Sequence, residues 1–106
     1  ILPADLPLDL TMEFDKLVHQ PTRLQLFAYL YRHEESTFSE LKDELGVTEG
    51  NLSSHIQTME DAGAVAVEKQ FVDRRPQTTY ELTDEGRAKF EEHIETLEAL
   101  LGQLED

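Results

Sequence analysis

The sequence has no cysteine, and this absence excludes a disulfide framework, a thiol switch and a thiolate zinc site. It has no run of 18 apolar residues either, so no segment is expected to span a membrane. The first residues lack the basic segment and the long apolar stretch of a secretory signal. Together these absences favour a cytoplasmic protein with no membrane partner.

Basic residues are scarce, because nine Lys and Arg stand against 23 Asp and Glu and give a net charge of −14. Such a surface repels nucleic acid at ordinary salt. Three interpretations are open: the protein does not bind nucleic acid, it gathers its few cations on one face, or it works in very high salt. At about 1 M salt the Debye length is roughly 3 Å, so distant repulsion is screened. We favour the second and third interpretations together.

The length of 106 residues and the apolar content of 39% fit one domain with a modest core. Periodicity predicts a mainly helical α+β fold, a winged helix-turn-helix, over residues 1–106. Residues 1–10 are expected to form an N-terminal arm. Residues 11–83 are expected to hold the helix-turn-helix and a β-hairpin wing, and residues 84–106 a long C-terminal dimerisation helix.

Two helices are expected before the helix-turn-helix. The first begins at Thr11 and ends before Pro21, and the second begins at Pro21 and runs to about Arg32. Apolar residues spaced by three and four predict the buried face of the second helix, which comprises Leu24, Phe27, Ala28 and Tyr31.

The helix-turn-helix is predicted to follow a very short strand at residues 37–38. Ser39 is expected to cap a short helix that Gly46 closes, and Thr48 to cap a second helix whose apolar face carries Leu52, Ile56 and Met59. The opposite face has small and amide side chains, which can approach base edges. The candidate DNA-reading residues are Thr48, Gly50, Asn51, Ser53, Ser54, Gln57 and Thr58. Because this helix has no Lys or Arg, a merely solvated polar face is the alternative.

After this helix the side-chain pattern repeats every two residues, as it does in a strand. It predicts strands at residues 65–67 and 78–82 with a hairpin tip at residues 72–77. The main basic cluster of the chain lies here, although a solvated turn would also explain it. The candidate residues for phosphate or minor-groove contact are Lys69, Arg74, Arg75, Gln77 and Thr78.

The last helix, which Thr83 is expected to cap, carries apolar residues at spacings of 4, 3, 4 and 3. This a/d pattern predicts a dimer interface formed by Phe90, Ile94, Leu97, Leu101 and Leu104. A two-fold dimer, aided by the N-terminal segment, would place two recognition helices roughly 34 Å apart, about one turn of DNA. The alternative is a helix that packs only on its own domain.

Four segments together resemble prokaryotic winged-helix regulators of the MarR/ArsR-like kind: residues 19–24 (HQPTRL), 46–56 (GVTEGNLSSHI), 60–65 (EDAGAV) and 71–83 (FVDRRPQTTYELT). The resemblance covers about residues 14–90 and implies a homodimer that reads pseudo-palindromic promoter DNA. The acidic surface is similar to that of haloarchaeal members, among which are regulators of the response to oxidative stress. Gln70, Asp73 and Gln77 depart from the basic wing of the family, which weakens the expected phosphate contacts.

Nothing in the sequence indicates catalysis, and we expect a protein that is not an enzyme. His19, His33, His55 and His93 form neither an HxH nor an HExxH pattern, so no metal and no cofactor is expected, although a composite metal site across a dimer stays open. His55 is expected to pack at the helix edge or to contact a phosphate. The acidic last helix offers no reason for a perturbed carboxylate pair.

The sequence thus predicts a homodimeric, sequence-specific DNA-binding regulator of transcription whose partners are double-stranded DNA and a second copy of the chain. Two alternatives stay open: a winged helix that serves protein contacts, and a ligand sensor with a pocket at the dimer junction. A small-molecule or ion effector is compatible with the prediction, but no motif identifies one.

Overall fold

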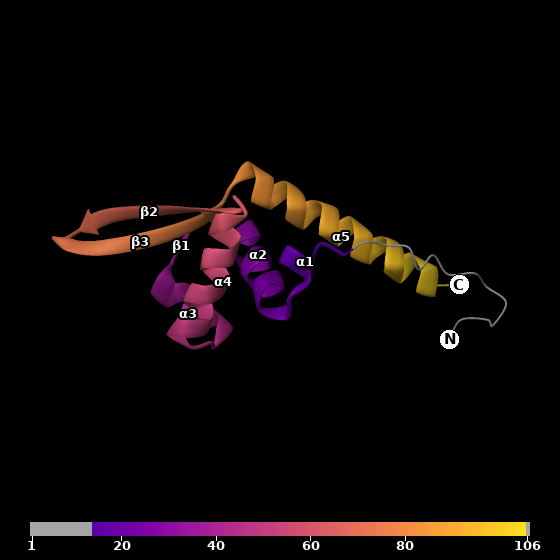
Figure 1. The fold of residues 1–106 in the computed structure, drawn as a ribbon, viewed down its shortest axis with the longest axis horizontal. Coiled ribbons are helices and arrows are strands. Elements are labelled where there is room, and N and C mark those ends of the chain that lie inside the picture. The colour runs from indigo at the N-terminus through magenta and orange to yellow at the C-terminus, as the bar shows by residue number, and fades with distance from the viewer. Residues whose placement is uncertain (1–13, 106) are drawn as a thin grey trace.

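The computed structural model describes residues 14–105, which form five helices and a three-stranded sheet (Figure 1). The elements in chain order are α1 (Lys16–His19), α2 (Pro21–Arg32), β1 (Ser36–Thr37), α3 (Phe38–Leu45), α4 (Glu49–Asp61), β2 (Val65–Val72), β3 (Arg75–Leu82) and α5 (Asp84–Leu104). The hairpin of β2 and β3 and the helix α5 extend to opposite sides of the helical core (Figure 1). This order confirms the predicted winged-helix fold. The predicted arm and the predicted helix start at Thr11 lie outside the described residues.

α2 begins as predicted, but its buried face is different. Pro21 occupies its first turn, and the side chain of Gln20 accepts a hydrogen bond of 2.8 Å from the backbone N–H of Arg23. The fully buried residues are Leu26, Phe27 and Leu30, whereas Ala28 is exposed, and Leu24 and Tyr31 are only partly buried. The prediction was right for Phe27 and wrong for Ala28, and it missed Leu26 and Leu30. The reason is that α2 contacts α1, α3, α5 and β3, so it is apolar over a wider arc than a one-sided helix.

The start of α3 also differs from the prediction, because Thr37 and not Ser39 is its N-cap. The Thr37 hydroxyl accepts a hydrogen bond from the backbone N–H of Glu40 at 3.2 Å, and the Glu40 carboxylate accepts one from the backbone N–H of Thr37 at 3.2 Å. This capping box satisfies two backbone donors at once, which a cap at Ser39 would not. β1 accordingly ends at Thr37. Gly46 closes α3 with a φ of 63°, as predicted.

The sheet has the order β1-β3-β2 and is antiparallel throughout. The pairing of β2 with β3 continues to Val72 opposite Arg75, which leaves only Asp73 and Arg74 in the turn. Both turn residues have positive φ, 52° and 68°, as the tight turns that match the twist of a hairpin require. The wing strands are therefore longer, and the tip shorter, than predicted.

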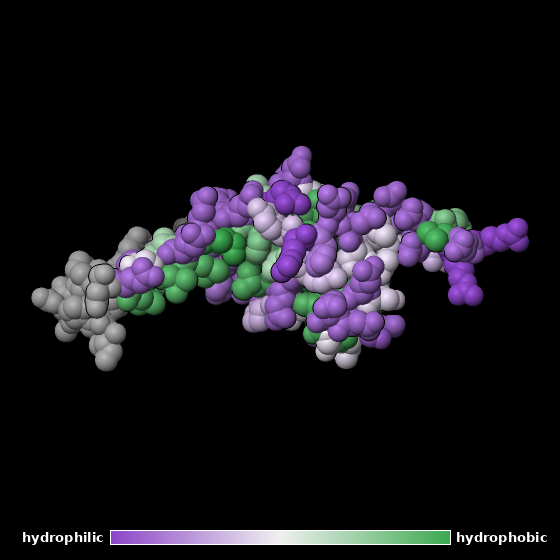
Figure 2. All heavy atoms as spheres, turned by 180° about the vertical axis from the view of Figure 1, so that it is seen from behind, coloured by the Kyte–Doolittle hydropathy of each residue, from purple (hydrophilic) through white to green (hydrophobic). Residues whose placement is uncertain are grey.

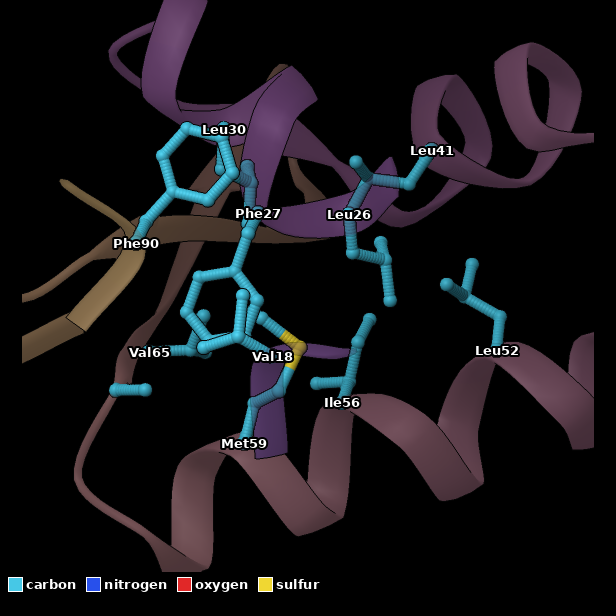
Figure 3. Packing of buried hydrophobic residues seen from close by; sticks show 11 residues of the cluster. Val18, Leu26, Phe27, Leu30, Leu41, Leu52, Ile56, Met59, Val65 and Phe90 are labelled. Carbon is cyan, nitrogen blue, oxygen red and sulfur yellow. The ribbon is translucent and has the colours of Figure 1, made fainter. Parts of the chain in front are cut away.

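One hydrophobic cluster joins the helices to the base of the sheet, and α4 contributes Leu52, Ile56 and Met59 to it (Figure 3). Phe90 of α5 is 7% exposed and belongs to the same cluster, with its ring 6.2 Å from that of Phe27. Its side chain is thus largely covered within its own chain, and its contact with a second subunit stays a prediction. Within residues 14–105, no helix combines the length and apolar character needed to cross a membrane.

The junction of the wing with α5 is held by close backbone contacts. The Thr83 side chain caps α5 by accepting from the backbone N–H of Gly86 at 3.0 Å, and it donates to the carbonyl of Gly63 at 2.6 Å. The backbone N–H of Thr83 donates to the carbonyl of Ala64 at 3.0 Å. A β-carbon on Gly86 would collide with the carbonyl oxygen of Ala64 and lie 2.8 Å from its carbonyl carbon.

We therefore predict that Gly86→Ala lowers the free energy of unfolding by about 1–3 kcal/mol, because backbone atoms must move to admit the methyl group. Gly50→Ala is the matched control. It adds the same methyl group within a helix at a position with nothing within 4 Å, so it should be neutral or stabilise the protein by about 0.5–1 kcal/mol. Urea unfolding measures both, and equal midpoints for Gly86→Ala and the unchanged protein would contradict the proposed close packing.

Candidate nucleic-acid interface

The exposed face of α4 carries all the predicted base-reading residues. The Thr48 hydroxyl caps the helix by accepting from the backbone N–H of Asn51 at 3.2 Å. Because Leu52, Ile56 and Met59 are buried on one side, the other side is fixed toward solvent. The exposed residues are Thr48, Gly50, Asn51, Ser53, Ser54, Gln57 and Thr58.

These side chains are not equally available. The Gln57 amide donates to the carboxylate of Asp61 at 2.9 Å, and the Thr58 hydroxyl donates to the carbonyl of Ser54 at 3.0 Å. The side chains of Asn51 and Ser53 have no hydrogen-bond partner among the described residues. Asn51 is therefore the amide of α4 that is ready to bind another molecule, whereas Gln57 must first leave Asp61.

The wing presents three exposed cations, Lys69, Arg74 and Arg75. In the part of the chain that the structure describes, the two ion pairs join Lys42 with Glu49 and Lys89 with Asp15, so neither involves the wing. The wing cations are thus free to bind an anion, in spite of the acidic composition of the whole chain.

A hollow of about 260 Å³ brings the two predicted groups of site residues together; we call it the helix–wing hollow. From α4 it is lined by Ser53 and Gln57, and from the wing by Lys69 and Thr78. The remaining lining residues are Phe38, Ile56, Glu60, Val67 and Tyr80. Burial, and to a smaller extent the charge of Glu60, raises the pKa of Tyr80, so this phenol stays a neutral hydrogen-bonding group.

The other predicted wing residues lie elsewhere. Arg75 and Gln77 line a separate hollow of about 580 Å³ beside the start of α3, which Thr37, Phe38 and Ser39 close on the other side. Arg74 occupies the turn itself. The wing therefore presents cations on more than one side of the hairpin.

Arg23, which the sequence analysis did not single out, ties α4 to the N-terminal helices. Its guanidinium donates to the carbonyls of Leu17 at 2.7 Å and Lys16 at 3.3 Å, and its Nη1 lies 3.1 Å from Nδ1 of His55. Burial and the positive charge of Arg23 lower the pKa of His55, so the neutral ring accepts this hydrogen bond. No local pattern marks the contact, because the two residues are 32 positions apart.

A second histidine contact joins α1 to α5. Nδ1 of His19 lies 3.1 Å from Nε2 of His93, and the ring of Phe14 stacks on that of His19 at 4.8 Å. His93 is buried, and burial first and the neighbouring His19 second lower its pKa, while Asp15 acts in the opposite direction. Among the described residues, no three or more His, Cys, Asp or Glu side chains come together to hold a metal ion.

Comparison with known proteins finds a matching family and a relative. The family model described as winged helix DNA-binding domain matches residues 22–101. An uncharacterized protein from Methanocaldococcus jannaschii is 33% identical over 79 residues, which cover 74% of this chain and 86% of that protein.

Two solved structures are similar in fold and sequence. The transcriptional regulator homologue protein from Pyrococcus horikoshii OT3 is 32% identical with a TM-score of 0.79, and the match covers 85% of this chain and 89% of that one. The YusO protein from Bacillus subtilis is 27% identical with a TM-score of 0.75, and the match covers 84% of this chain and 62% of that one.

The lowered pKa of His93 predicts that the protein loses stability as the pH falls from 7.5 to 6. The unfolded chain, in which a histidine has a pKa of about 6.5, then binds more protons than the folded chain. The stabilising effect is present above pH 6.5 and is lost as the pH drops toward the folded pKa. His93→Gln should flatten the curve of unfolding free energy against pH. Identical slopes for His93→Gln and the unchanged protein would disprove this assignment.

Proposed function

The chain belongs to the winged helix DNA-binding domain family, and we propose that it is a sequence-specific regulator of transcription that binds pseudo-palindromic promoter DNA as a homodimer. The observation that carries this proposal is the helix–wing hollow, where polar side chains of α4 and an unpaired cation of the wing face one space. A duplex presents both features that this surface would bind, which are base edges and phosphates. The role is one of binding and not of catalysis.

The two parts of the surface have different tasks in this proposal. α4 lies in the major groove, where Asn51 is suited to adenine because its amide matches the donor and acceptor of that base. Ser53 and Ser54 are short enough to let the helix approach closely. The wing arginines Arg74 and Arg75 bind phosphates or the adjacent minor groove, which adds affinity for every sequence.

The homodimer is proposed from the outer part of α5. Leu101 and Leu104 are 59% and 49% exposed, and Figure 2 shows apolar side chains gathered along this end of the helix. Leu97 and Ile94 continue the same face toward the core. Pairing of two such faces around a two-fold axis would cover them and would present two α4 helices about one DNA turn, roughly 34 Å, apart.

The acidic composition supports a high-salt setting for this binding. With a net charge of −14, long-range repulsion from DNA must be screened, and it is screened at about 1 M salt. The resemblance to haloarchaeal regulators extends the proposal to a stress response in a high-salt cytoplasm. A small-molecule or ion effector would act on the same dimer.

One observation favours a second function, in which the winged helix binds protein instead of DNA. α4 has no Lys or Arg on its exposed face, and it carries Glu49, Glu60 and Asp61. A binding screen against genomic DNA fragments in low and in molar KCl separates the two functions, because only the first predicts enriched fragments.

We predict that Arg74→Ala combined with Arg75→Ala weakens binding to all DNA sequences alike. Each lost phosphate contact should reduce the slope of log affinity against log salt by about 1. Arg32→Ala, which removes an exposed arginine at the far end of α2, is the control and should leave the affinity unchanged. Fluorescence anisotropy titrations measure both quantities, and an unchanged slope in the double variant would refute the role of the wing.

We also predict that Leu101→Asp with Leu104→Asp converts the dimer into monomers, because two charges would have to enter an apolar interface. Ala99→Asp is the matched control, since this exposed residue lies on the opposite face of α5. Sedimentation equilibrium in 2 M KCl gives the mass of each variant. If the unchanged protein sediments as a monomer at concentrations where it binds DNA, the dimer proposal fails.

A further inference from the structure

Near its tip the wing exposes apolar side chains that lie outside the hydrophobic core. Phe71 is 79% exposed and Val72 is 43% exposed, whereas the other phenylalanines among the described residues are buried or partly buried. Figure 2 shows an apolar patch near the end of the hairpin, flanked by hydrophilic side chains that project beyond it. A large aromatic side chain that is mostly exposed is a candidate for contact with another molecule.

The register of the hairpin places Phe71 on a particular face. Side chains two residues apart on a strand share a face, so Phe71 lies on the same side of β2 as Lys69. Across the hairpin, Lys69 pairs with Thr78 and Phe71 pairs with Pro76. Because Lys69 and Thr78 line the helix–wing hollow, this alternation places Phe71 beyond that lining, nearer the tip and on the same face of the hairpin. Its partner Pro76 also lines the hollow beside the start of α3.

We propose that Phe71, backed by Pro76, packs on the deoxyribose rings of the DNA strand that passes between α4 and the wing. This inference rests on the proposed DNA binding and adds a contact to it. The surroundings fit such a strand, because Lys69 and Arg74 provide cations on either side of an apolar surface. A DNA strand has the matching pattern, in which phosphates alternate with the apolar faces of sugars.

The contact answers a physical problem that the charge of the chain creates. Phosphate contacts lose affinity as the salt concentration rises, because releasing counterions from the DNA into a concentrated salt solution is less favourable. Burial of an apolar ring does not depend on that release. A protein with three wing cations and a net charge of −14 therefore keeps part of its affinity at high salt through Phe71.

The test compares Phe71→Ala, Phe71→Leu and Val72→Ala with the unchanged full chain, in titrations of a fluorescent duplex from 0.2 to 3 M KCl. Phe71→Ala should weaken binding by about tenfold at every salt concentration without changing the salt slope, and Phe71→Leu should restore most of the loss. Val72→Ala removes apolar surface from the opposite face of the same strand and should change the affinity by less than about twofold. Arg74→Ala should differ in kind, because its effect shrinks as salt rises.

Each other outcome overturns the inference in a distinguishable way. If the unchanged protein binds DNA and Phe71→Ala binds equally well, the inference alone is wrong and the proposed function stands. If Phe71→Ala changes the sedimenting mass instead of the DNA affinity, this face contacts a second copy of the chain. If the unchanged protein binds no duplex, both the inference and the proposed function fail. Because the substituted residues are exposed, each variant should fold, and thermal unfolding checks that it does.

Discussion

The proposed interface exists only because one side of α4 is buried. Leu52, Ile56 and Met59 pack into the cluster that α2 and α5 share, and this packing leaves only the polar side of α4 open to a partner. Arg23 adds a second constraint from α2 through His55. The wing is positioned by the same core, because the start of α5 and the segment that joins α4 to β2 meet at Gly86 and Ala64. These contacts hold α4 beside the base of the hairpin.

The acidic chain can bind DNA, as proposed, because unpaired cations lie on its wing. Acidic residues dominate the sequence, yet the wing keeps three cations without an ion-pair partner among the described residues. α4 contributes neutral polar side chains and no cation, so its contacts with a duplex would depend on hydrogen bonds. A binding surface of this kind is expected to be selective and to depend less on salt than a basic one.

The order of the helices and strands could be predicted from the sequence because each has a strong local signal. Gly46, for example, marks the C-terminus of α3, and Thr48 marks the N-terminus of α4. Features that depend on tertiary contacts could not be predicted in this way. Phe90 continues the apolar pattern of α5, but the core of its own domain covers it. The contacts of Arg23 with His55 and of His19 with His93 link residues 32 and 74 positions apart, and no periodicity reports such pairs. The exposed faces of α4 and the wing were predictable, whereas the placement of Phe71 required the strand register.

In the proposed complex, two copies of this surface read one duplex. Selection of bound sequences from a random duplex pool in 2 M KCl, followed by sequencing, shows whether they do. We expect enrichment of an inverted repeat whose half-sites are centred one helical turn apart, roughly 10 base pairs. A pool that stays random after repeated selection, or that yields a single half-site without symmetry, would contradict it.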